Sequence, residues 1–228
     1  DNDSIARLGA WPFPRSIFAT AFQKLSKARP LAVGLDVMLS EPSRLGAGDD
    51  AALASALASA NYPIIFPFEA ELSAGENSFR AVAAITPLPQ FVLTKNVALG
   101  HVNLLIDSDG VARRFPMEIE YKEDIIGPFA EKLVQAAGLP LPSVEERERV
   151  ERIVFSGYPG AVRRIPFWRL VLGDIGKELE GKIVMIGADS WAIEVVPHEN
   201  PRRPFEVHQW TLTRHGVYHH ENLDLEEL

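Results

Sequence analysis

The stretch HVNLLIDSDGVARRFPMEIE, residues 101–120, sets the fold that we predict for this chain. It contains two apolar segments joined by Asp107-Ser108-Asp109-Gly110. An Asp-Gly pair between β-rich segments is the strongest short-range signal for a hairpin, because glycine adopts the positive φ that a tight turn needs. The stretch therefore predicts a β-hairpin, and we place the rest of the fold around it.

The charged residues of this hairpin allow two interpretations. Asp107 and Asp109 lie at the turn, and Arg113 and Arg114 follow on the second arm. They could form local ion pairs on a solvated surface, and such pairs contribute little stability. Alternatively, two acids and two arginines at one end of a sheet could line a recognition site.

Segments on both sides of the hairpin alternate between helical and strand patterns. This alternation predicts an α/β fold with a mixed, largely parallel central sheet flanked by helices and an irregular C-terminal tail. Helices are expected at residues 15–29, 51–60, 128–137 and 166–172, and further strands at 31–39, 63–68, 152–155 and 183–186. We expect Pro67 to interrupt its strand and the polar residues 69–77 to form a loop.

Asp36 lies inside the apolar run LAVGLDVML, residues 31–39. A carboxylate in such a run needs partners, so it usually lies at the end of the strand or binds a ligand. Asp36 and Gly187, near the ends of two predicted strands, could flank a crevice at the carboxyl edge of a parallel sheet. Arg15, close to Trp11, is a further candidate, although a helix cap and a core aromatic are the simpler roles for this pair.

Composition and missing motifs exclude several functions. The net charge of −8 argues against a nucleic-acid partner. The absence of cysteine excludes disulfides and thiolate chemistry, and it is compatible with a bacterial extracytoplasmic compartment. The Gly-x-Ser-x-Gly, Gly-x-Gly-x-x-Gly and Walker sequences are also absent. We therefore expect no enzyme activity, no catalytic residue, no bound metal and no cofactor.

Five segments in order resemble the CHASE2 domain family. They are WPFPR (11–15), AVGLD with SEP (32–36, 40–42), GHVN with DSDG and two arginines (100–103, 107–110, 113–114), FSGYPG (155–160) and GKIVMIGA (181–188). The resemblance covers about residues 1–188. It implies the extracytoplasmic, ligand-sensing domain of a bacterial transmembrane signalling receptor, with transmembrane helices and a cytoplasmic cyclase, kinase or similar output domain as its partners.

We expect this domain to bind an unknown small molecule, and a homodimer is one assembly that we consider. The candidate ligand-binding residues are Arg15, Asp36, Asp107, Asp109, Arg113 and Arg114. Because the sequence begins at an aspartate rather than a methionine, we also expect it to be part of a longer protein.

Residues 189–228 are predicted to form a separate, appended tail. They resemble the C-terminal part of the metal-dependent cyclase family related to kynurenine formamidase, in which His208 would match a catalytic histidine and Glu221 a metal ligand. The main metal motif of that family, His-x-Gly-Thr-His-x-Asp, is absent, and too few ligands are left for a catalytic metal. The tail is therefore interpreted either as a fusion remnant or as a frame or assembly accident, and we expect it not to pack on the domain. A fragment of a metal-dependent cyclase or amide hydrolase is the alternative function.

Overall fold

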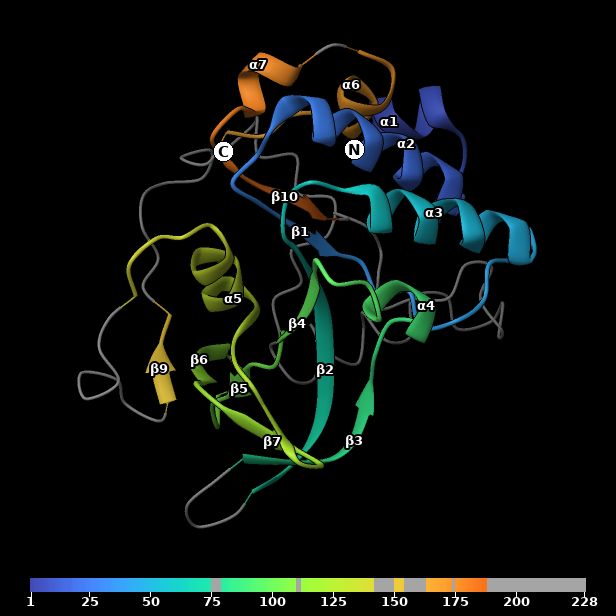
Figure 1. Ribbon diagram of the computed structural model, residues 1–228. Coiled ribbons are helices and arrows are strands. Elements are labelled where there is room, and N and C mark those ends of the chain that lie inside the picture. The colour runs from blue at the N-terminus through green and yellow to red at the C-terminus, as the bar shows by residue number, and fades with distance from the viewer. Residues whose placement is uncertain (75–78, 110–111, 142–149, 154–162, 174, 188–228) are drawn as a thin grey trace.

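The computed structural model describes residues 1–74, 79–109, 112–141, 150–153, 163–173 and 175–187 (Figure 1). The helices in these residues are α1 (Asn2–Leu8), α2 (Arg15–Ala28), α3 (Ala47–Ser59), α4 (Pro89–Val92), α5 (Phe129–Ala136), α6 (Phe167–Leu172) and α7 (Gly176–Leu179). The strands are β1 (Ala32–Asp36), β2 (Ile64–Ala74), β3 (Phe79–Ile85), β4 (Val97–His101), β5 (Leu105–Ile106), β6 (Ala112–Pro116), β7 (Ile119–Tyr121), β8 (Asp124–Ile126), β9 (Val150–Arg152) and β10 (Ile183–Gly187).

Strand β2 is the centre of the main sheet. Its first half pairs in parallel with β1 and β4, and its second half pairs antiparallel with β3. Beyond these, β10 pairs in parallel with β1, and β7 and β8 extend the sheet from β3. The predicted α/β fold with a mixed, largely parallel sheet and flanking helices is therefore confirmed.

The hairpin predicted within residues 101–120 forms, but it does not organise the main sheet. β5 pairs antiparallel with β6, and β6 pairs with β9, in a separate three-stranded sheet. The first arm is shorter than predicted because His101 belongs to β4, where it pairs with Phe68 of β2. Ile119 likewise begins another strand of the main sheet. The predicted turn glycine, Gly110, lies outside the described residues.

The prediction that Pro67 interrupts a strand was wrong, as was the predicted loop for residues 69–74, which belong to β2; residues 75–77 of that loop lie outside the described residues. On one edge, β2 pairs with β1 up to Ile65 and with β3 from Glu69, so Pro67 falls between these two pairings. Its missing N–H therefore breaks no pair with β1 or β3. On the other edge, Pro67 is in register with Gly100 of β4. From residue 68 to 73, buried or half-buried residues alternate with exposed ones, which is the pattern of a strand with one covered face.

Helices cover both faces of the parallel part of the sheet. Figure 1 shows α2 and α3 side by side over one part of the sheet, with α5 apart from them. Val33 of β1 packs in the core that includes α2 and α3, whereas Ala32 packs in a second core with Phe129 and Leu133 of α5. Because neighbouring strand residues point to opposite faces, α5 lies on the face opposite α2 and α3.

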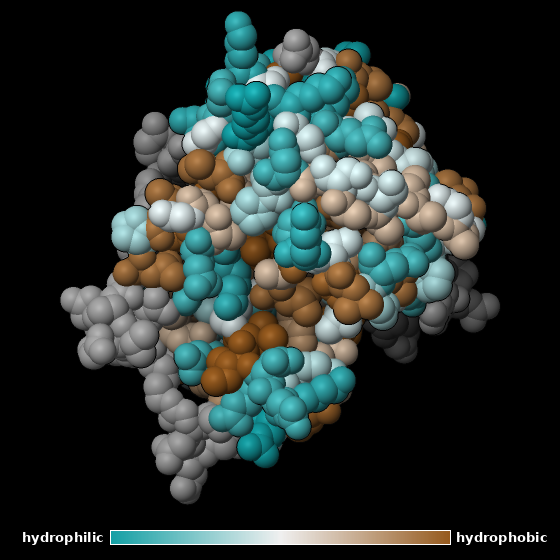
Figure 2. Space-filling model, in the orientation of Figure 1, coloured by the Kyte–Doolittle hydropathy of each residue, from teal (hydrophilic) through white to brown (hydrophobic). Residues whose placement is uncertain are grey.

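The antiparallel end of the sheet is less completely covered by the described residues. Val82 and Ile85 of β3 and Ile125 of β8 are 62%, 50% and 61% exposed. Figure 2 shows apolar side chains at the surface in the lower half of this view, below a mainly polar helical layer. Among the described residues, helices therefore cover the parallel half of the sheet more completely than the antiparallel half.

Candidate functional site

A hollow of about 620 Å³ lies at the carboxyl end of β1. It is lined by residues 11–15, by Phe18 of α2 and by residues 36–45. Asp36, the last residue of β1, is in register with Gly187, the last residue of β10. Two parallel strands therefore end at one sheet edge, as predicted. We call this cavity the Asp36 hollow.

Asp36 makes no hydrogen bond or ion pair with any other residue that the structure describes. Its side chain reaches solvent, but it also lines the hollow, where neighbouring atoms displace part of its hydration. This burial raises the pKa of the Asp36 carboxyl group. The carboxylate consequently has the capacity to accept hydrogen bonds or to pair with a cation that enters the hollow.

Arg15 also lines the Asp36 hollow, but its guanidinium group is already engaged. Its Nε lies 3.4 Å from Oδ1 of Asp50, and its Nη2 donates to the Glu41 carbonyl at 3.0 Å. Asp50 is only 3% exposed and also accepts a hydrogen bond from the Ser43 amide at 2.9 Å. Arg15 therefore fixes the wall of the hollow by joining α2, α3 and the loop after β1, so it is a structural residue of the site.

Asp49 supplies the cap that α2 lacks locally. Pro14 precedes the helix and has no side-chain cap, but Asp49 accepts hydrogen bonds from the Arg15 and Ser16 amides at 2.8 and 2.9 Å. The Ser43 hydroxyl donates to the same carboxylate at 2.6 Å. Burial raises the pKa of Asp49, but these hydrogen bonds outweigh that effect, and the pKa is lowered.

Sequence reasoning missed these roles of Ser43, Asp49 and Asp50. The two acids were recognised only as an acidic helix start, and this location is correct because both lie in the first turn of α3. Their partners on α2 are more than thirty residues away along the chain. No local pattern could have paired residues at that separation.

The aromatic wall of the Asp36 hollow continues to α6. The rings of Trp11 and Phe13 are 5.3 Å apart and meet edge to face, and Trp11 makes a similar contact with Phe18 at 6.3 Å. Phe13 in turn stacks on Phe167, the first residue of α6, at 5.9 Å. A displacement of this wall would therefore also displace the start of α6.

Helix α1 is attached to the same end of α6. Oδ2 of Asp1 accepts from the Phe167 amide at 3.3 Å, and Oγ of Ser4 accepts from the Trp168 amide at 3.0 Å. The guanidinium carbon of Arg7 lies 4.1 Å from the centre of the Trp168 ring. Packed contacts consequently run from the hollow through α6 to α1.

The four charged hairpin residues form a separate cluster that does not line the Asp36 hollow. Arg113 pairs with Asp107 and Asp109 at 3.1 and 2.8 Å, and Arg114 pairs with Asp107 at 2.6 Å. Hydrogen bonds from Arg114 and Arg113 hold the pKa of Asp107 below its usual value. The structure thus brings Arg15 and Asp36 together, and it places the hairpin acids and arginines against one another elsewhere.

The segment Gly100–Asn103 joins β4 to its neighbours. A Cβ atom on Gly100 would lie 2.5 Å from Cα of Phe129, so only glycine allows this approach of α5. The Asn103 side chain accepts from the Ala70 amide at 3.0 Å and donates to the Ala70 carbonyl at 2.7 Å, which extends the pairing of β2 beyond β4. His101 is 2% exposed, and this burial lowers its pKa to about 4 although the Pro116 backbone opposes the shift.

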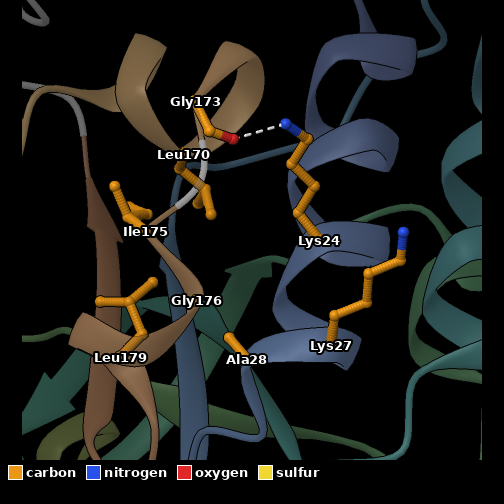
Figure 3. Close-up of a pocket in the computed structure, with 8 residues that line it drawn as sticks. All are labelled: Lys24, Lys27, Ala28, Leu170, Gly173, Ile175, Gly176 and Leu179. Atoms are coloured by element: carbon orange, nitrogen blue, oxygen red, sulfur yellow. Dashed lines mark hydrogen bonds between the residues drawn. The ribbon is translucent and has the colours of Figure 1, made fainter.

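A second, smaller hollow of about 240 Å³ lies between α2 and the segment of α6 and α7 (Figure 3). Its lining is largely aliphatic. Lys24 donates to the Gly173 carbonyl at 2.7 Å, and Figure 3 shows the amino group of Lys27 turned away from Leu170 and Ile175. Because its polar groups do not converge on a common point, we consider the Asp36 hollow the stronger candidate site.

Two features are absent from the part of the chain that the structure describes. It contains no group of three or more histidine, aspartate or glutamate side chains that could hold a metal ion. None of its helices combines the length and the apolar character that crossing a membrane requires. His208, Glu221 and the rest of residues 189–228 lie outside the described residues, so the predictions for the tail stay predictions.

Comparison with known proteins gives one match. The sequence model of the CHASE2 domain matches residues 1–222, which includes most of the segment that we compared with the cyclase family. No curated protein and no solved structure matches the chain. CHASE2 domains are extracellular sensory domains without catalytic activity of their own. Since the match spans nearly the whole chain, this protein belongs to the CHASE2 family.

Proposed function

We propose that this chain is the ligand-binding, non-catalytic sensory domain of a bacterial transmembrane signalling receptor, located on the extracytoplasmic side of the membrane. The observation that carries the proposal is the Asp36 hollow, whose lining includes parts of two segments that resemble the family: residues 11–15, and residues 36 and 40–42. The volume of about 620 Å³ is within the range of small-molecule sites.

The contacts around the hollow also connect a bound ligand to helices α6 and α1. A ligand against Trp11 and Phe13 would press on Phe167, whose amide is held by Asp1 of α1. Sensing requires only that the ligand binds one arrangement of these helices better than another. We propose that α1 and α6 are the elements whose arrangement changes, and that a transmembrane helix and a cytoplasmic cyclase, kinase or similar domain respond to them.

The proposal is tested by filling the hollow in the full-length receptor. Ser40 lines the hollow and is exposed, so Ser40→Trp places an indole ring inside it. Ser55 is exposed on α3 and does not line the hollow, so Ser55→Trp is the matched control. Typical coupling energies correspond to about 5- to 150-fold changes. We therefore expect Ser40→Trp to change basal output at least about 5-fold and Ser55→Trp to leave it unchanged.

Equal outputs from the two variants, at equal amounts of receptor in the membrane, would contradict a sensory role for the hollow. The location is tested separately by labelling a cysteine introduced into this chain, which contains none. A receptor that carries Ser55→Cys, with any cysteine outside this chain replaced by serine, should react with a membrane-impermeant maleimide in intact spheroplasts. Labelling only after lysis would contradict the extracytoplasmic location.

A further inference from the structure

We propose that the Asp36 hollow binds a small organic cation, with an ammonium group paired to Asp36 and the apolar part of the ligand against Trp11. This inference rests on the proposed function, because it names the chemical class of ligand for the same hollow. It is carried by the uncompensated charge of the lining and by the aromatic wall.

The charges that line the hollow leave a negative surplus. Arg15 is compensated by Asp50, with which it forms an ion pair. Among the remaining charged side chains of the lining, Asp36 and Glu41 are acids and Arg44 is the one base. Arg44 uses one N–H to donate to the Pro12 carbonyl at 3.1 Å. A cationic ligand would balance this surplus, whereas an anion would increase it.

Asp36 is the acid best placed to receive the cation. It ends β1, lines the hollow, and has no hydrogen-bond or ion-pair partner in the described residues. A carboxylate that loses hydration without gaining a partner lowers the stability of the fold. A partner supplied by a ligand removes this disadvantage, and the pairing is stronger in the hollow than on an open surface because less water screens it.

Trp11 supplies the second feature that a cation with an apolar part would use. Its ring is half-buried, lines the hollow and is held edge to face by Phe13 and Phe18. These contacts fix the ring before any ligand arrives, which reduces the entropy lost on binding. The ring offers an apolar surface to the carbon atoms of the ligand, and its face also attracts an ammonium group that lies nearby.

The test follows backbone amide shifts of the ¹⁵N-labelled 228-residue chain during titration. The probes are choline, butylammonium, the neutral choline isostere 3,3-dimethylbutan-1-ol and the dianion succinate. Asp36→Asn removes the charge with little change in shape. Asp124→Asn makes the same change at an exposed position of β8 that does not line the hollow, so it is the matched control.

We expect at least one of the two cations to shift the amides of residues 11–18 and 36–45. Losing the charge of Asp36 should weaken binding of that cation to Asp36→Asn by about 10- to 100-fold, with Asp124→Asn unchanged. The neutral alcohol should bind at least about 10-fold more weakly than that cation. The pH dependence should follow Asp36, with cation binding lost as acid protonates its carboxylate.

The outcomes separate this inference from the proposed function. If the alcohol binds as tightly as the better of the two cations, if wild type and Asp36→Asn bind that cation equally, or if succinate binds preferentially, the cation is overturned and the hollow stays a ligand site. If neither cation shifts the amides of the hollow, the cation is overturned, and the outputs of Ser40→Trp and Ser55→Trp decide the sensory role separately.

Discussion

Replacing Asn103 by alanine tests whether a side chain completes the central strand. The Asn103 amide makes two hydrogen bonds with the backbone of Ala70, at 3.0 and 2.7 Å, and Ala70 is only 7% exposed. Alanine leaves a buried N–H and a buried carbonyl without partners, and each such group costs about 1–3 kcal/mol. We expect the free energy of unfolding to fall by about 2–4 kcal/mol, measured by urea denaturation at pH 7.

Two further variants make this experiment specific. Asn61→Ala removes a longer, exposed hydrogen bond of 3.4 Å and should cost less than about 0.5 kcal/mol. Asn103→Asp keeps an acceptor for the Ala70 amide but turns a second acceptor toward the Ala70 carbonyl. Its stability relative to Asn103→Ala should therefore increase on acidification, because the protonated acid can donate. A loss for Asn103→Ala no larger than that for Asn61→Ala would refute the reasoning.

Three other substitutions follow from the structure. Gly100→Ala should destabilise the fold by about 3 kcal/mol, because the new Cβ would lie 2.5 Å from Cα of Phe129. Gly48→Ala should stabilise it by about 0.4–1 kcal/mol, because a Cβ there meets no atom within 4 Å. Equal melting temperatures of the two variants would contradict this. Asp36→Asn should stabilise the fold at pH 7 but not at pH 3. The pKa of Asp36 is raised in the folded state, so wild type loses stability as the pH rises from 3.8 through that folded pKa. If urea titrations give the same difference in unfolding free energy between variant and wild type at both pH values, the prediction is wrong. Asp49→Asn should destabilise the fold at pH 7, and its loss of unfolding free energy relative to wild type should shrink in acid. The pKa of Asp49 is lowered in the folded state, which gives wild type stability above pH 3.8 that is lost as the pH falls through the folded pKa. A loss that does not change with pH would argue against the cap.

The sequence predicted the parts of the fold that depend on local pattern. The apolar run before Asp36 forms a buried strand, and its register with Gly187 brings two strand ends together as expected. The helix beginning at Arg15 starts where predicted. Arg15 and Asp36 line one hollow, so this part of the candidate site could be recognised from residue types and strand ends.

The parts that failed depend on pairing between distant segments. Pro67 lies inside a strand because its position falls between two pairings, which its own sequence does not reveal. The two arms of the hairpin pair as predicted, but membership of a separate sheet is decided by the pairing of β6 with β9. For the same reason, Arg113 and Arg114 could not be assigned to or excluded from the hollow by their sequence.

The shared caps between α1 and α6 have a mechanical consequence. Asp1 accepts hydrogen bonds from the amides of both Ser4 and Phe167, and the Ser4 hydroxyl accepts one from the Trp168 amide. The side chains of Asp1 and Ser4 therefore hold the first turns of α1 and α6 together. Rotating α1 by a fraction of a turn would release both α6 amides together, at about 1 kcal/mol for each bond. Because both bonds join the same two helices, α6 would be either held by α1 or released from it.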